Sequence, residues 1–148
     1  MKIPGPDHPI TIAFNPKRVQ VLFGGHLIAD TAAALILQEA DYPAMPYIPR
    51  ADAEMSVLAR TDHHTHCPYK GEASYFSISR DGRTAENAVW SYEEPYPAME
   101  QIRGMLAFYP NQVEIVEIDQ GADAVGEVIE HTDSGAGQSQ LEHWPAND

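Results

Sequence analysis

The sequence predicts a single, mainly β domain with short helices. Three segments carry this prediction, because each has strand-like residues on both sides of a turn signal: residues 18–30, 72–92 and 105–118. A length of 148 residues is that of one domain, and it is enough to bury a core without disulfides. We divide the chain into a Pro-rich arm (1–16), the β domain (17–118) and an acidic C-terminal extension (119–148) that we expect to be partly disordered.

The first hairpin is centred on Gly24-Gly25, a pair that supplies the positive φ of a two-residue turn. A turn centred there places Phe23 opposite His26. The next segment, residues 31–40, fits a short helix or a buried strand equally well, since it is too short for its periodicity to decide.

The middle of the chain has weaker signals. Three prolines make residues 42–50 extended but unsuited to a central strand. We expect a helix of two to three turns at residues 51–60 and a polar loop at residues 61–71.

The second hairpin has the strongest local signal, because Asp-Gly at residues 81–82 is the preferred chemistry of a type I′ turn. This register pairs Ile78 with Ala85 and Phe76 with Asn87. Both faces of the hairpin then mix aromatic rings with carboxylates, although a sheet with one wet face keeps its large aromatics on the dry side. We interpret the mixture as a lined cavity or a barrel with filled ends.

The third hairpin is expected at residues 105–118, with its turn at Pro110-Asn111. The apolar residues change phase within residues 113–118, which predicts a β-bulge.

The charge distribution argues against two classes of partner. The formal net charge is −13, and residues 104–148 hold nine of the 22 acidic residues and no Lys or Arg. Nucleic acid requires clustered basic residues, so it is not expected as a partner. A membrane is not expected either, because we find no long apolar run, basic amphipathic stretch or signal peptide. The single cysteine excludes an internal disulfide and favours the cytoplasm.

The segment THCPYKGEASYF, residues 65–76, concentrates residues that can do chemistry. Cys67 is a candidate catalytic nucleophile or redox thiol, because His66 and Lys70 supply positive charge that lowers a thiol pKa, and Glu72 could orient one of them. The alternative is that Cys67 is a buried, small apolar residue. We favour that alternative, because one thiol near a histidine is not a catalytic triad until geometry shows it. The chain also has no second cysteine that could resolve an oxidised thiol.

A metal site is a second hypothesis for the same region, where His63, His64, His66 and Cys67 lie within five residues. Neighbouring residues in a loop seldom all reach one ion. We therefore favour a solvated histidine-rich loop and expect neither a metal nor another cofactor.

A small-molecule pocket is the third hypothesis, and we place it where residues 65–75 meet the strand at residues 84–92. Lys70 would contact an anion or carbonyl group, and Glu72 would be its ion-pair partner or a general base. Tyr75 and Trp90 would form the walls. The other candidate ligand-binding residues are Arg50, His66, Glu86, Asn87 and Tyr92. A purely structural polar network explains the same residues equally well.

Several linked motifs resemble one protein family over roughly residues 17–118. The motifs HCPYKGEASYF, ENAVWSYEEPYP and LAFYPNQVEI, with VLFGGHLIADT and YIPRAD upstream, resemble domain-of-unknown-function family 427, sometimes labelled a nucleotidyltransferase-like domain. The resemblance implies tent-like or barrel-like antiparallel sheets, similar to the fold of Mss-four. It assigns no activity, and the chain lacks the Gly-Ser turn and spaced aspartates that nucleotidyl transfer needs.

These observations favour a small-molecule-binding β domain, or an enzyme, whose partner is a small polar or carbonyl-bearing metabolite. A thiol-dependent redox or acyl-transfer enzyme using Cys67 is the first alternative. A non-catalytic interaction module is the second, and exposed sheet edges also make a homodimer reasonable.

Overall fold

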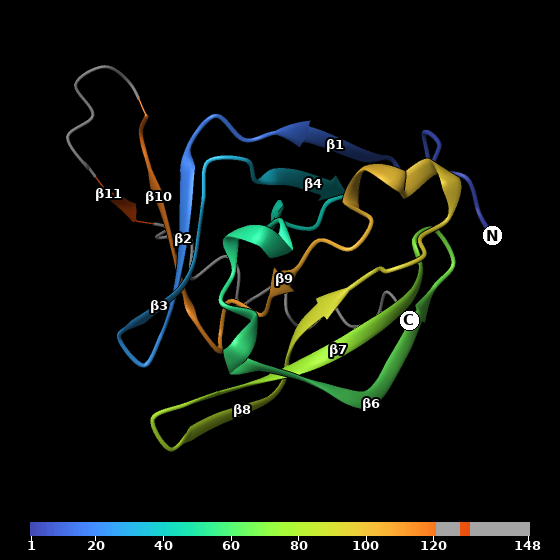
Figure 1. Ribbon diagram of the computed structural model, residues 1–148. Coiled ribbons are helices and arrows are strands. Elements are labelled where there is room, and N and C mark those ends of the chain that lie inside the picture. The colour runs from blue at the N-terminus through green and yellow to red at the C-terminus, as the bar shows by residue number, and fades with distance from the viewer. Residues whose placement is uncertain (121–127, 131–148) are drawn as a thin grey trace.

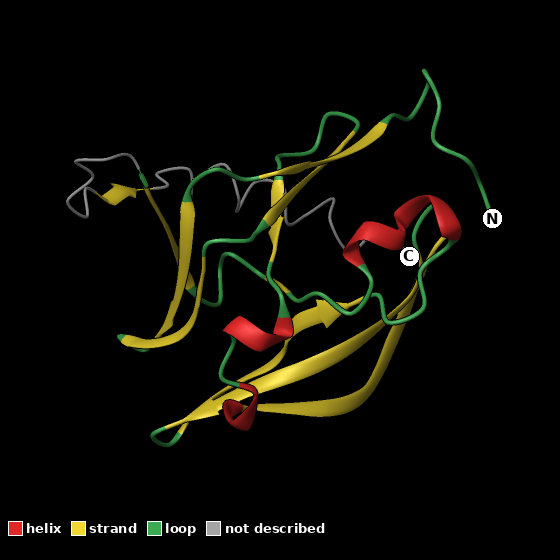
Figure 2. Ribbon diagram, turned by 45° about the horizontal axis from the view of Figure 1, so that its top comes forward, coloured by secondary structure: helices red, strands yellow, loops and turns green. Residues whose placement is uncertain are grey.

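The computed structural model describes residues 1–120 and the backbone of residues 128–130, and it confirms a mainly β protein with few, short helices. The strands form three antiparallel sheets, and within the described residues none of them closes into a barrel (Figure 1). The expected barrel-like closure is therefore replaced by three open sheets. Figure 2 shows how small the helical share is. The helices are the 3-10 segments η1 (Arg50–Asp52), η2 (Met55–Val57) and η3 (Pro97–Ile102).

The first sheet has the order β1-β4-β5. Its strands are β1 (Ile10–Phe14), β4 (Leu35–Glu39) and β5 (Met45–Tyr47). The ambiguous segment 31–40 is thus a strand, and part of the expected N-terminal arm is also a strand, because Ile10 pairs with Glu39 and Phe14 with Leu35. The proline-containing strand β5 lies at the sheet edge, where the missing N–H of Pro46 does least harm.

The second sheet has the order β11-β10-β2-β3. Its strands are β11 (Val128–Glu130), β10 (Glu114–Ile118), β2 (Arg18–Phe23) and β3 (His26–Thr31). The predicted turn between β2 and β3 is confirmed, since Gly24 and Gly25 have φ values of 56° and 84°. Phe23 and His26 pair across it as expected.

The third sheet has the order β6-β7-β8-β9. Its strands are β6 (Leu58–Cys67), β7 (Gly71–Arg80), β8 (Arg83–Ser91) and β9 (Ala107–Phe108). The expected helix at 51–60 is replaced by η1, η2 and the start of β6, and the expected loop at 61–71 is wrong, because residues 61–67 continue β6. The hydrogen bonds and side-chain pairs between β6 and β7 outweigh the local helix propensity of these residues.

The β7–β8 hairpin has the predicted turn but a different register beyond it. Ile78 pairs with Ala85 as expected, whereas Phe76 pairs with Val89 rather than with Asn87. Asn87 sits in a bulge with φ of 51°, and its backbone N–H donates to the Ser77 hydroxyl at 3.0 Å. The bulge brings Tyr75 opposite Trp90 on one face.

The expected hairpin at residues 105–118 is wrong. Its first half, β9, pairs with β8 in the third sheet, and its second half, β10, pairs with β2 in the second sheet. The ladder between β10 and β2 has an unbroken register, so the predicted bulge is also absent from this strand. This segment therefore joins two sheets rather than forming a two-stranded unit.

Two apolar clusters lie on opposite faces of the third sheet. One contains Phe76, Ile78 and Val89, together with residues of β2 and β3. The other contains Tyr75, Trp90 and Cys67, together with residues of β4 and β5. Alternate residues of a strand point to opposite faces, so β7 and β8 contribute to both clusters.

Candidate functional site

A fully buried ion pair lies inside the second apolar cluster. Lys70, which directly precedes β7, has an exposed fraction of 0%, and its ammonium contacts Oε1 of Glu39 at the end of β4. Glu39 is 3% exposed. Its other oxygen, Oε2, contacts Nε2 of His8 at 2.8 Å. One carboxylate thus joins a buried lysine to a histidine of the N-terminal arm.

Aromatic side chains surround this ion pair. The Lys70 Nζ lies 5.7 Å from the centre of the Tyr92 ring, a cation–π distance. Trp90 donates from Nε1 to the Tyr47 hydroxyl at 3.1 Å, and the Tyr75 hydroxyl lies 2.9 Å from Oγ1 of Thr65. We call the set the Lys70 cluster; its members, all 3% exposed or less, are Glu39, Tyr47, Cys67, Lys70, Tyr75, Trp90 and Tyr92.

Burial keeps the phenols of the Lys70 cluster neutral. Loss of solvent raises the pKa of Tyr47 and of Tyr92 well above the usual value, and the negative charge of Glu39 raises both further. A neutral phenol can donate a hydrogen bond to an oxygen atom, whereas a phenolate cannot. Both phenols therefore keep their hydroxyl protons.

Cys67 belongs to the same cluster, but its environment disfavours a thiolate. Burial raises the pKa of the thiol, although the Lys70 ammonium opposes part of this rise. His66 points elsewhere: its Nδ1 lies 3.7 Å from Glu72 and its Nε2 lies 3.5 Å from the Tyr96 hydroxyl. The structure thus separates the thiol from its proposed base, and reactive cysteines have the opposite, partly exposed setting.

The remaining predicted site residues do not join the Lys70 cluster. Glu72 and Glu86 are exposed, so neither is the ion-pair partner of Lys70. Asn87 lies in the β8 bulge and accepts a hydrogen bond from Thr61 at 2.6 Å. Arg50 instead binds Glu93.

Sequence reasoning missed Glu39 and His8, each of which lies 31 residues from its partner. For Glu39 a signal existed, because it falls in phase with Leu35 and Leu37 on an otherwise apolar strand. A carboxylate at a buried strand position needs a cation nearby. His8 has no such signal, since it stands in a proline-rich arm.

The N-terminal arm covers one side of the ion pair. The His8 ring stacks on Tyr69 with ring centres 4.2 Å apart, and the Lys2 backbone N–H donates to the carbonyl of Pro68 at 2.7 Å. Farther along, Ala40 donates to the carbonyl of Pro9 at 2.8 Å. These contacts hold residues 2–9 against the turn that carries Lys70.

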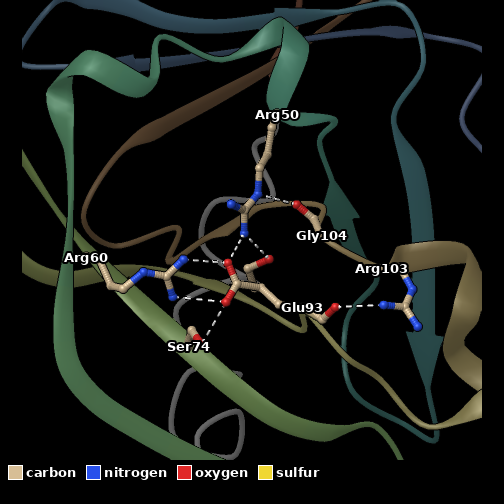
Figure 3. A network of polar contacts seen from close by, with 7 residues as sticks. Arg50, Arg60, Ser74, Glu93, Arg103 and Gly104 are labelled. Atoms are coloured by element: carbon tan, nitrogen blue, oxygen red, sulfur yellow. Dashed lines mark hydrogen bonds and ion pairs between the residues drawn. The ribbon is translucent and has the colours of Figure 1, made fainter.

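A second polar network lies on the other face of the third sheet (Figure 3). Arg60 of β6 binds both carboxylate oxygens of Glu93, with distances of 2.9 and 2.7 Å. Arg50 of η1 donates to the same carboxylate at 2.7 Å and to the carbonyl of Gly104 at 2.6 Å. Hydrogen bonds from these two arginines lower the pKa of Glu93 to about 2. The arginines thus hold Glu93 as an anion.

The histidines of β6 point in different directions. His63 packs edge-on against the Tyr75 ring, with 4.5 Å between ring centres, while His66 faces Tyr96. Over residues 1–120 no group of three or more His, Cys, Asp or Glu side chains is placed to share a metal ion.

The fold and this cluster together define a class: a mainly β protein with a buried, aromatic-lined ionisable centre at the junction of two sheets. The chain belongs to the family described as "Domain of unknown function (DUF427)", whose model matches residues 11–119. The resemblance drawn from the motifs is therefore confirmed. No curated protein matches the chain. Among the described residues no helix has the length and apolar character needed to cross a membrane.

Proposed function

We propose that this protein is a small-molecule-binding β domain whose ligand is a small polar or carbonyl-bearing metabolite, held at the Lys70 cluster. One observation carries the proposal: a lysine, a glutamate, a cysteine and three tyrosines are gathered from several elements, and all are 3% exposed or less. Ionisable groups in such surroundings are concentrated at functional sites.

The cost of burying Lys70 and Glu39 supports a functional role. Removing two charges from water costs several kcal/mol per ion, and well-packed apolar residues are often equally stabilising. Stability alone therefore does not account for this pair. Binding or chemistry at the ammonium supplies such a reason.

The chemistry of the cluster indicates the ligand class. The Lys70 ammonium and the neutral phenols of Tyr47 and Tyr92 are donors, which suit the oxygen of a carbonyl or a small oxyanion. The rings of Tyr75 and Trp90 would cover the apolar part of the ligand. The side chain of His8, which contacts Glu39, is 26% exposed, whereas Glu39 is buried. We therefore infer that a ligand enters beside the N-terminal arm.

No observation favours thiol chemistry, because the Cys67 thiol is buried and its pKa is raised. A cytoplasmic location and a homodimer through a free sheet edge, such as β6, remain parts of this proposal. Edge strands present unpaired backbone groups that a second copy could use.

A thermal-shift screen of small carbonyl and carboxylate metabolites tests the proposal. The informative variant is Glu39→Gln with Lys70→Met, which removes both buried charges together and leaves neither one unpaired. The matched control removes the exposed Arg18–Asp30 pair, through Arg18→Gln with Asp30→Asn.

A true ligand raises the melting temperature of the wild type and the control, since a ligand stabilises the state that binds it. It leaves the Glu39→Gln/Lys70→Met variant unchanged. The proposal fails if no compound stabilises the wild type, or if a stabilising compound acts equally on all three proteins.

A further inference from the structure

We propose that Arg50 and Arg60 form a second binding site, for a small oxyanion group such as a carboxylate or a phosphate, on the face of the third sheet opposite the Lys70 cluster. The two guanidinium groups come from η1 and β6 and converge on the Phe76 ring, with distances of 5.4 and 5.0 Å to its centre. Figure 3 shows both pointing at the Glu93 carboxylate. We call Arg50, Arg60 and Glu93 the arginine site.

The position of the arginine site follows from the alternation of side chains at the end of β8. Trp90 and Tyr92 belong to the Lys70 cluster. Ser91 and Glu93 alternate with them and contact Arg50, at 3.0 and 2.7 Å. The two sites therefore lie back to back, and this proposal does not depend on the ligand proposed for the Lys70 cluster.

The charges at the arginine site do not cancel. Two guanidinium groups carry a charge of +2 and Glu93 carries −1, so the site has an excess of +1 in a chain whose net charge is −13. Arg103 adds nothing to this excess, because Glu100 binds it at 2.7 Å and Glu94 also faces it. An anion of charge −1 would complete the neutralisation of Arg50 and Arg60.

Both arginines also keep donors available. Arg50 uses Nε and Nη2, and Arg60 uses Nη1 and Nη2. The Nη1 of Arg50 and the Nε of Arg60 donate to no residue in the described part of the chain. The side chains are 32% and 50% exposed, so an oxyanion can approach from solvent. Arginine suits this task, because its planar fork matches carboxylate and phosphate oxygens.

Glu93 does not need both arginines as partners, although Arg50 also binds the Gly104 carbonyl and the Ser91 hydroxyl. Arg60 alone gives Glu93 a two-fold hydrogen-bonded partner, and Ser74 adds a further contact at 3.2 Å. Bringing Arg50 to the same carboxylate sets two like charges side by side, which costs free energy unless another anion compensates. The second guanidinium is the feature that points to a ligand.

Titration with sodium phosphate and, separately, with sodium acetate tests the proposal, with sodium chloride keeping the ionic strength constant. The full-length protein is followed by its melting temperature. Arg60→Gln removes the excess charge and leaves the Arg50–Glu93 pair intact. Glu93→Gln raises the excess from +1 to +2. Arg80→Gln is the control, since Arg80 also pairs with one glutamate, Glu54, and is 31% exposed.

We expect phosphate or acetate to stabilise the wild type and the Arg80→Gln variant alike. Arg60→Gln should weaken the apparent affinity roughly tenfold, because one charge-assisted contact is lost. Glu93→Gln should strengthen it, which a merely structural network does not predict. A response to phosphate alone identifies a phosphate group, a response to acetate alone identifies a carboxylate, and a response to both supports any small oxyanion.

Three results would overturn the proposal. One is no stabilisation of the wild type by either anion. Another is an equal response of all four proteins, which would mean an adventitious ion only. A third is loss of the response in the Glu39→Gln/Lys70→Met variant, because the anion would then be bound at the Lys70 cluster. If Arg60→Gln does not fold, an unchanged or weaker response of Glu93→Gln is sufficient to reject the site.

Discussion

At the scale of single residues, the Lys70 cluster depends on the pairing of Lys70 with Glu39, because both charged side chains are buried. The sequence placed Lys70, Tyr75, Trp90 and Tyr92 near one another, and the structure brings them into one cluster. Glu39 could be marked as a charge at a buried strand position, but its pairing with Lys70 could not be predicted, because the contact joins the end of β4 to the turn before β7 across 31 residues. Neighbours along a strand are predictable from alternation, but partners across sheets are not.

We predict that Lys70→Ala destabilises the protein by about 3–5 kcal/mol, because it leaves Glu39 charged, buried and without its ammonium partner. The Glu39→Gln/Lys70→Met variant should lie within about 1 kcal/mol of the wild type, since neither charge then remains. Urea denaturation of the three proteins at pH 7 measures the difference. An equal free energy of unfolding for Lys70→Ala and the wild type would contradict the burial of the Lys70–Glu39 ion pair.

Glu93 should make stability depend on acid pH. Its pKa falls from 4.5 when unfolded to about 2 in the folded protein, so its stabilising contribution is complete above pH 4.5 and is lost as the pH falls towards 2. The stability difference between the wild type and Glu93→Gln should therefore shrink between pH 5 and pH 3. Chemical denaturation at these two pH values checks this prediction. An unchanged difference in the free energy of unfolding would contradict the lowered pKa of Glu93.

At the scale of elements, turns were predictable and pairing partners were not. Gly24-Gly25 and Asp81-Gly82 form the expected turns because these residue types adopt positive φ without help from the rest of the fold. The helix expected at 51–60 became η1, η2 and the start of β6, because its pairing partner lies in a separate strand. The register predicted beyond the second turn is wrong from Asn87 onward, because the pattern of apolar residues does not indicate the bulge there.

The β8 bulge gives a prediction of its own. Asn87 holds a φ of 51°, a conformation that glycine adopts freely and β-branched residues avoid. Asn87→Val should cost about 2 kcal/mol, from backbone strain and from the lost hydrogen bond of Thr61. Asn87→Gly loses only the hydrogen bond and should cost about 1 kcal/mol or less. Similar losses in urea for the two variants would show that the bulge does not impose the strain.

At the scale of the whole molecule, the mainly β class followed from the sequence, but the division into three sheets did not. Two strand pairings define that division. β10 pairs with β2, which lies far from it in the sequence, and β9 pairs with β8. Alternation identifies a strand and its apolar face, yet it carries no information about which distant strand is its neighbour. The sequence therefore predicted a β domain with a polar, aromatic region but not the separation of Arg50 from Lys70.

The end of β8 has a thermodynamic consequence for the two proposed sites. Residues 90–93 are one short length of backbone whose side chains serve opposite faces. A ligand that displaces the backbone at Tyr92 would also displace Ser91 and Glu93, and an anion that draws Arg50 away from Glu93 would act in the reverse direction. Whatever free energy of coupling results is the same in both directions. Occupancy measured on one face then reports on the affinity of the other, so the two ligands should be studied together.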